Sequence, residues 1–236
     1  MKFKHFLNEQ EKEQEQELVE AAVTKAFFYA KDAHKGQTRS DGSRYIKHPV
    51  RVANIVKKYK TSKNLNDILA AAYLHDTIED TKTTENDIKQ LFGGLVSSLV
   101  KELTSDKDKI KEVGKTQYLV DKMTNMSSWA LVIKLADRLD NVSDLRTAKS
   151  VAWRQKYKKE TEEILHRLQM NRELSATHKT IIAEIKKKLD DLSEETVTGL
   201  VAGVRSSDEP PVKKFKKKSE LIKKMLTRTK PVDITK

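Results

Sequence analysis

Apolar residues recur at every third or fourth position through most of the chain, which is the spacing of an amphipathic helix. Over residues 14–34 this spacing puts Leu18, Ala22, Ala26 and Tyr29 on one inward face. The same pattern predicts further helices over residues 49–59, 65–79, 94–104, 115–125, 128–143, 151–173 and 178–192, and a short one that begins at Thr84. No segment shows strong strand-like alternation. The sequence therefore predicts an all-α fold, a compact multi-helix bundle without repeats.

Several residues mark where these helices begin and end. Pro49 suits the first position of a helix. Thr84 and Asp87 have the spacing of a capping box, and Gly93 with Gly94 is expected to end the short helix that follows. The glycine-containing segment over residues 35–47 is predicted to be a loop.

Composition narrows the class of protein. The 236 residues include no run of eighteen apolar residues and no apolar N-terminal stretch, so neither a membrane span nor a signal peptide is expected. The chain has no Cys, which excludes disulfides, thiolate metal sites and a cysteine nucleophile. We predict a cytoplasmic protein.

The formal charge of +12 is concentrated near the C-terminus. Residues 204–236 hold eleven Lys or Arg and four Asp or Glu, so residues 1–203 carry only +5. We predict a folded domain over residues 1–200 and a lysine-rich linker and tail over 201–236, with one short helix possible over 219–228. The basic tail predicts weak contact with nucleic acid, and the sequence leaves the oligomeric state open.

Four ionisable residues follow an apolar run in the segment YLHDTIEDT. His75 and Glu79 are four residues apart, as are Asp76 and Asp80, so on a helix they form two neighbouring polar pairs. Burying such groups costs free energy unless they are paired or bind a ligand. The alternative is a solvated helix end with one ordinary histidine.

A second carboxylate site lies in LVIKLADRLDNV. Asp137 follows an apolar run and is expected to face the interior, with Asn141 one turn further along the same side. Arg138 and Asp140 are expected to point elsewhere and to form salt bridges within the body. A buried Asp137 paired with an arginine is the structural alternative.

His48 precedes Pro49 and can project from a helix start toward another helix. Two imidazoles and two carboxylates, from His48, His75, Asp76 and Asp137, can hold one divalent cation and leave positions open for water and substrate. The loop before His48 contains a cluster suited to phosphate oxygens, namely Lys35, Arg39, Arg44 and Lys47. A solvated basic loop is the alternative.

Three segments, AHKGQTRSDGSRYIKHPVRVA, AAYLHDTIEDT and IKLADRLDNV, together resemble the HD-domain phosphohydrolases, and within them the hydrolase domain of the RelA/SpoT family. The resemblance covers about residues 20–170. No synthetase-like domain follows, so the chain looks like a small stand-alone alarmone hydrolase. The resemblance implies an HD-domain bundle in which a manganese ion is held by His48, His75, Asp76 and Asp137.

The resemblance also implies roles for further residues. Glu79 and Asp80 match an acidic pair that orients or deprotonates the attacking water, and Asn141 matches a residue that positions substrate. The residues matched to substrate binding are Lys31, His34, Arg39, Arg154 and Tyr157.

The chain departs from the family pattern at two positions, with Arg44 in place of Pro and Asp140 where His is frequent. These departures leave the identity of the nucleotide substrate open.

The first hypothesis for the function is metal-dependent hydrolysis of the 3′-pyrophosphate of (p)ppGpp to GDP or GTP and pyrophosphate. One alternative is a phosphohydrolase of another nucleotide, such as NADPH, an adenosine alarmone or a deoxynucleotide. The other is a regulatory HD protein tethered to nucleic acid or ribosomes by its tail. Zn, Fe or Co could replace Mn.

Overall fold

The computed structural model describes residues 20–145 and 150–197, with side chains placed as far as residue 192. These residues belong to one unit, Met1–Val197. Within them every regular element is a helix, and the strand-like pairing is limited to one antiparallel bridge between Thr38 and Arg44. The predicted all-α bundle is confirmed. The predicted domain boundary near residue 200, the lysine-rich tail and the helix over 219–228 lie outside the described residues and stay predictions.

The helices follow one another with short connections. In chain order they are a first helix over residues 20–33, α2 (Lys47–Tyr59), α3 (Leu65–Leu74), α4 (Thr77–Asp80), α5 (Glu85–Leu103), α6 (Lys107–Val113), α7 (Lys115–Asn125), α8 (Ser128–Ser143), α10 (Val151–Asn171) and α11 (Ala176–Val197). Most boundaries agree with the sequence prediction within a few residues. The part of the first helix that was predicted over 14–19 lies outside the described residues.

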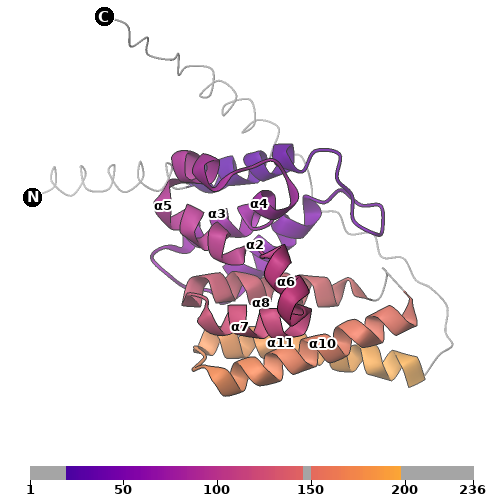
Figure 1. Ribbon diagram of the computed structural model, residues 1–236. Helices are drawn as coiled ribbons and strands as arrows, with labels where there is room; N and C mark the ends of the chain where they lie inside the picture. Colours follow the sequence, from indigo (N-terminus) through magenta and orange to yellow (C-terminus); the bar gives the residue numbers. More distant parts are fainter. Residues whose placement is uncertain (1–19, 146–149, 198–236) are drawn as a thin grey trace, which may run out of the picture. The chain divides into compact units, whose positions relative to one another are not determined.

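Helix α8 is the centre of the bundle. It packs against α2, α3, α5 and α11, and in Figure 1 it lies between the group α2 to α5 and the pair α10 and α11. Its apolar residues from Ala130 to Leu139 are buried on every side rather than along one stripe, which is typical of a central helix. Polar residues on α8 are therefore drawn into the interior together with the apolar ones.

The helix predicted over residues 65–79 is in fact two helices, α3 and α4, separated by a turn at His75 and Asp76. Two side chains bond to carbonyls that a continuous helix would use for its backbone ladder. Thr77 Oγ1 donates to the Leu74 carbonyl at 2.7 Å, and His75 Nδ1 lies 2.9 Å from the Ala72 carbonyl. These bonds satisfy the end of α3 and place His75 and Asp76 at a corner of the chain.

The predicted start of α5 and the predicted break at its glycines are confirmed. Thr84 and Asp87 form a reciprocal capping box, and Gly93 adopts a φ of 87° that breaks the helix into two segments. A positive φ is strained for residues other than Gly, so this kink depends on residue type. Helix α6 was not predicted, because its sequence KDKIKEV has two apolar residues and none of its residues is buried.

No helix in the described part of the chain combines the length and the apolar character needed to cross a membrane. This agrees with the absence of a long apolar run in the sequence. Location in the cytoplasm stays a prediction.

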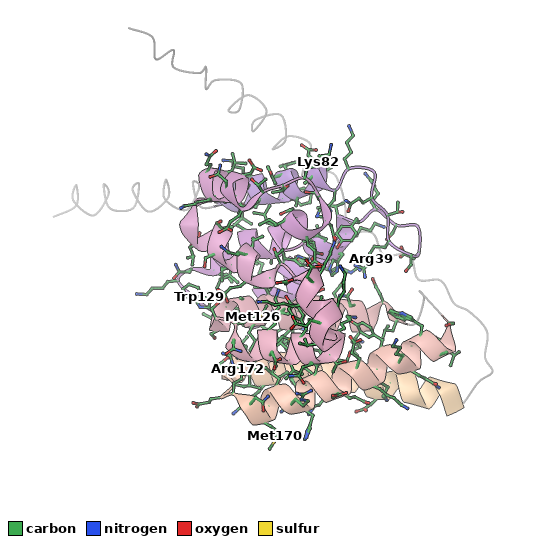
Figure 2. The ribbon with its side chains drawn as sticks, viewed as in Figure 1. Arg39, Lys82, Met126, Trp129, Met170 and Arg172 are labelled. Carbon is green, nitrogen blue, oxygen red and sulfur yellow. The ribbon has the colours of Figure 1, made fainter. Side chains whose placement is uncertain are left out.

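We expect Leu131→Ala in α8 to destabilise the protein strongly. Leu131 is fully buried, and removing such a side chain leaves a cavity that costs about 2–5 kcal/mol of unfolding free energy. The matched control is Met170→Ala, because Met170 projects from α10 away from the bundle with 74% of its surface exposed (Figure 2). Urea denaturation should show a change below about 0.5 kcal/mol for this control. Similar losses in the two variants would contradict the central position of α8.

Candidate metal centre

Three of the four predicted metal ligands meet in the interior. Potential ligand atoms of His48, His75 and Asp137 all lie within 4.8 Å of one another, and all three residues are buried. His48 comes from the first turn of α2, His75 from the corner between α3 and α4, and Asp137 from α8. The fold thus brings together residues that are up to 89 positions apart in the sequence.

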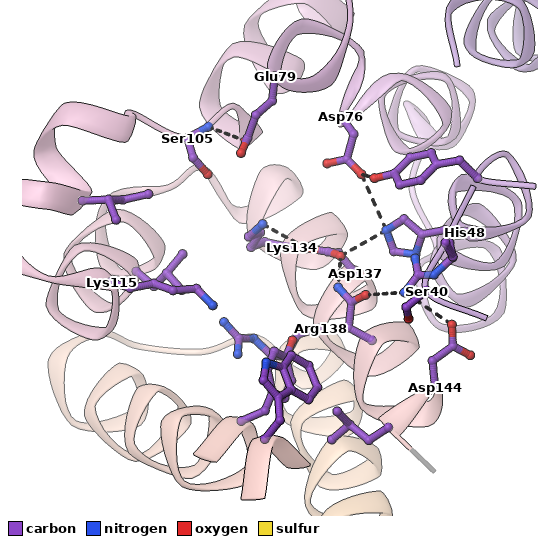
Figure 3. Close-up of a pocket in the computed structure, with 18 residues that line it drawn as sticks. Ser40, His48, Asp76, Glu79, Ser105, Lys115, Lys134, Asp137, Arg138 and Asp144 are labelled. Atoms are coloured by element: carbon purple, nitrogen blue, oxygen red, sulfur yellow. Dashed lines mark hydrogen bonds and ion pairs between the residues drawn. The ribbon is translucent and has the colours of Figure 1, made fainter. Parts of the chain in front are cut away.

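Asp76, the fourth predicted ligand, lies beside this group. Its Oδ2 is 2.8 Å from His75 Nε2 and 3.6 Å from His48 Nε2. Figure 3 shows Asp76 and Asp137 pointing toward His48, with Lys115 and Arg138 across the cavity from Asp76 and His48. All four predicted ligands are therefore adjacent.

The donor set fits a divalent cation. Each histidine is held through Nδ1, by Asp140 Oδ2 at 2.6 Å for His48 and by the Ala72 carbonyl at 2.9 Å for His75. Both Nε2 atoms therefore face the carboxylates, the arrangement in which histidines bind metals. His75 Nε2 is buried without a hydrogen bond although Asp76 Oδ2 is close. Two imidazole nitrogens beside two carboxylates could hold a divalent metal.

The carboxylates of this cluster are held ionised. Burial raises the pKa of Asp137, but the ammonium of Lys134 and the bonds with His48 outweigh it and hold the pKa well below its usual value. Lys134 Nζ lies 2.9 Å from Asp137 Oδ2, and Asn141 donates to Asp137 Oδ1 at 2.6 Å. Burial likewise raises the pKa of Asp76, but the contacts with His75 and the charge of His48 together outweigh it and hold the pKa below its usual value. Tyr45 donates a short hydrogen bond to Asp76 Oδ2.

A cavity of about 490 Å³ opens beside the cluster. Its lining combines three of the candidate metal ligands with cations and aromatic rings. The lining residues that matter most are Arg39, His48, Asp76, Glu79, Lys115, Lys134, Asp137, Arg138, Asn141, Trp153 and Tyr157. This volume lies within the range of small-molecule sites.

The two residues of the predicted acidic pair occupy different places. Glu79 lines the cavity, and its Oε2 accepts a hydrogen bond from the backbone N–H of Ser105 at 2.8 Å. Asp80 lines a neighbouring cavity instead, with its Oδ2 3.5 Å from the Tyr45 hydroxyl. Burial and the charges of Asp76 and Glu79 raise the pKa of Asp80.

Arg39 and Asn141 reach the cavity together. Asn141 Oδ1 accepts from Arg39 Nη2 at 2.9 Å while its amide nitrogen donates to Asp137. The loop that carries Arg39 is fixed by backbone bonds, from Arg39 to the Ser43 carbonyl and from Gly42 to the Arg39 carbonyl, both at 2.9 Å. The arginine is therefore presented by an ordered turn.

The other residues predicted to bind substrate do not all line the main cavity. Lys31 and His34 line a separate cavity of about 290 Å³, where His34 is buried and its ring lies 4.6 Å from that of Tyr45. Arg154 is half-buried on α10 and is not among the residues that line the main cavity. Tyr157 lines the main cavity. Its ring is stacked on that of Trp153, with 5.2 Å between ring centres, and the Arg138 guanidinium lies 5.1 Å from the centre of the Tyr157 ring.

Sequence reasoning missed several cavity residues. Arg138 was expected to point elsewhere, yet it lines the cavity while it pairs with Glu160 at 3.4 Å. Lys134 could have been found as the one charged residue within the apolar run LVIKLA, and Trp153 by its helical spacing from Tyr157. Asp140 forms the expected salt bridge, with Arg51, and in addition contacts His48.

Comparison with known proteins identifies relatives over this same region. Residues 26–175 match the family described as HD domain. The Escherichia coli protein "Bifunctional (p)ppGpp synthase/hydrolase SpoT" is 37% identical over 181 residues, which are 74% of this chain and 24% of that protein. The mouse protein "Guanosine-3′,5′-bis(diphosphate) 3′-pyrophosphohydrolase MESH1" is 39% identical over 137 residues, covering 56% of this chain and 74% of that one. The chain thus spans about a quarter of the length of the bifunctional bacterial relative.

A solved structure has the same fold. It is described as "A metazoan ortholog of SpoT hydrolyzes ppGpp and plays a role in starvation responses". The match has a TM-score of 0.61 and 29% identity, and it covers 71% of this chain and 95% of that one.

We expect metal affinity to rise with pH. Burial lowers the pKa of His48, but its bonds with Asp137 and Asp140 outweigh this and raise the pKa from 6.5 to about 9 without metal. A metal ion must displace this proton, so affinity should increase by about tenfold per pH unit below pH 9, with about one proton released per ion. Calorimetric titration with Co²⁺ at pH 6.5–8.5, in two buffers of different ionisation enthalpy, measures both quantities.

The same shift predicts the opposite pH dependence for the metal-free protein. A raised pKa in the folded state contributes stability that is fully present below pH 6.5 and is lost as the pH rises through about 9. In the calorimetric titrations, a metal affinity that stays constant between about pH 6.5 and 8.5 would show that His48 is not a ligand.

Proposed function

Because the chain belongs to the HD-domain family, we propose that it is a metal-dependent hydrolase that removes pyrophosphate from the 3′ position of (p)ppGpp. The products would be GDP or GTP and pyrophosphate. The printed names of its relatives describe this activity for proteins that share the same domain. The observation that carries the proposal is the single cavity in which the His and Asp cluster, four cationic side chains and two stacked aromatic rings meet.

The proposed metal ligands are His48, His75, Asp76 and Asp137, and the proposed ion is Mn²⁺. A divalent ion in such a site neutralises phosphoryl oxygens and acidifies a water molecule. The support in this chain is the donor set itself, since imidazole and carboxylate groups suit Mn²⁺ as well as Zn²⁺, Fe²⁺ and Co²⁺. Asp140 and the Ala72 carbonyl would hold the two rings so that Nε2 remains available.

Glu79 is the best-placed proton acceptor for the attacking water. It lines the cavity, and the Ser105 N–H orients one of its oxygens, leaving the other able to accept a proton. General bases of this kind contribute about 10²–10⁴-fold to the rate. Asp80 faces the neighbouring cavity and would influence the reaction through Tyr45, which contacts both Asp80 and the ligand Asp76.

The cations of the cavity suit the phosphate groups of a nucleotide. Arg39 and Arg138 offer planar guanidinium groups, each of which can bind two phosphate oxygens at once. Lys115 adds an ammonium group, which lies 3.1 Å from Glu160 Oε1. Asn141 couples Arg39 to the ligand Asp137, so the phosphate-binding and metal-binding parts would be positioned together.

The aromatic wall suits the nucleoside. Trp153 and Tyr157 are stacked with an angle of 22° between their planes, and such rings can pack against a base or a ribose. Stacking on such rings does not by itself distinguish guanine from the other bases. The predicted contributions of Lys31, His34 and Arg154 stay predictions, since these side chains do not line this cavity. A contact between the tail and nucleic acid also stays a prediction.

We expect purified protein with Mn²⁺ to convert guanosine tetraphosphate to GDP and pyrophosphate. A chromatographic assay should compare guanosine tetra- and pentaphosphate with NADPH, an adenosine alarmone and deoxynucleotides. His75→Ala should abolish turnover while circular dichroism stays unchanged. If the guanosine nucleotides stay intact while another nucleotide is consumed, the proposed substrate is wrong although the proposed metal chemistry remains.

We expect Glu79→Gln to lower kcat by about 10²–10⁴-fold, because glutamine keeps the bond from the Ser105 N–H but cannot accept a proton at neutral pH. Metal affinity in this variant should stay within about twofold of the wild type, because Glu79 lies outside the ligand group. The matched control is Asp80→Asn, which makes the same chemical change on the adjacent residue. A larger loss in Asp80→Asn than in Glu79→Gln would reverse the assignment of the base.

A further inference from the structure

Arg51 connects two parts of the site without touching the cavity. Its Nε donates to Asp140 Oδ1 at 2.5 Å, and its Nη2 donates to Asp140 Oδ2 at 3.0 Å and to Asp144 Oδ2 at 2.6 Å. We call these three residues the Arg51 bridge. Arg51 comes from α2, whereas Asp140 lies in α8 and Asp144 caps its C-terminus.

One arm of the bridge ends on a proposed metal ligand. Asp140 Oδ2 lies 2.6 Å from His48 Nδ1, the ring nitrogen that faces away from the cluster. A carboxylate on this nitrogen fixes the tautomer and the orientation of a metal-binding histidine and increases its basicity. Asp140 thus contacts the proposed ligand directly and would influence a bound ion through it.

The other arm ends on the phosphate-binding arginine. Asp144 Oδ2 accepts from Arg51 and lies 3.3 Å from Arg39 Nη2. Arg39 in turn bonds to Asn141, and Asn141 bonds to Asp137. The contacts then form a closed ring, because Asp137 Oδ1 lies 3.3 Å from His48 Nε2.

The charges explain why the bridge needs an arginine. The Asp140 side chain is only 3% exposed, and a buried carboxylate without a counter-charge is strongly unfavourable. When the His48 ring is neutral, as metal binding requires, Arg51 is the cation that contacts Asp140 in the described part of the chain. A lysine could not bond to both Asp140 oxygens and Asp144 with one fixed fork.

We propose that Arg51 is a positioning residue that holds Asp140 against His48 and Asp144 against Arg39, and so couples the metal centre to the phosphate-binding arginine. The Arg39 arm rests on the proposed function, whereas the His48 arm concerns metal binding alone. A purely structural role, in which Arg51 only joins α2 to α8, predicts lower stability without these functional changes.

The first test measures metal affinity by calorimetric titration of Mn²⁺ into the full-length protein. Arg51→Met should weaken binding by about 10–100-fold, the usual effect of removing support behind a ligand. Asp140→Asn should have a similar effect, because it keeps an acceptor for His48 Nδ1 but loses the charge. The matched control is Arg167→Met on α10. Arg167 pairs with Glu163 and Gln117, and neither of these residues belongs to the closed ring of contacts around His48 and Arg39. This control should bind Mn²⁺ as the wild type does.

The double variant Arg51→Met with Asp140→Asn separates the proposal from a structural role. If Arg51 acts through Asp140, the double variant binds Mn²⁺ no more weakly than the worse single variant. Additive losses, or an Arg51→Met protein that binds Mn²⁺ within twofold of the wild type while melting at a lower temperature, would overturn the His48 arm.

The Arg39 arm is tested by kinetics at saturating Mn²⁺, which removes the effect of metal affinity. Arg51→Met should then raise KM by about tenfold and lower kcat by less, since it loosens a group that binds substrate. Arg51→Lys should recover metal affinity in part but leave KM raised, because the ammonium cannot bond to both carboxylates in the same way. Unchanged KM would overturn this arm. If no guanosine nucleotide is hydrolysed, the proposed function fails while the Mn²⁺ titrations still decide the His48 arm.

Discussion

The carboxylate of Asp137 lies on a helix whose central apolar residues are buried on every side, and the surrounding polar groups keep it charged. Lys134 and Asn141 bind it from the same helix, and His48 approaches it from α2. An isolated carboxylate at this position would destabilise the fold by several kcal/mol. The elements around α8 are therefore constrained by charge pairing as well as by apolar packing, and the candidate metal centre is where these constraints meet.

This constraint explains the irregular geometry nearby. The corner between α3 and α4 gives up helical backbone bonds, and the side chains of His75 and Thr77 bond to the carbonyls at the end of α3. In an uninterrupted helix, the side chains of His75 and Asp76 would point in directions about 100° apart around the helix axis. At the corner, His75 Nε2 and Asp76 Oδ2 come within 2.8 Å of each other.

Much of this arrangement could be predicted from the sequence. The bounds of α8 follow from its apolar run. His48, His75, Asp76 and Asp137 were predicted to be metal ligands from their residue types together with the family resemblance, and the fold places them next to one another. The corner at residue 75 could not be predicted, because helical periodicity continues through it and only side-chain bonding interrupts the ladder. The pairing of Arg51 with Asp140 joins residues 89 positions apart, and it depends on how α2 packs against α8. The different environments of Glu79 and Asp80 also arise from packing, since the sequence presents them as equivalent neighbours.

The bond between Ser105 and Glu79 has a consequence for how the site tolerates mutation. Glu79 is oriented by the backbone N–H of Ser105 and not by its hydroxyl. Every amino acid except proline carries this donor. Substitutions at position 105 other than proline therefore keep this donor, and the orientation of the Glu79 carboxylate depends on the path of the main chain between α5 and α6.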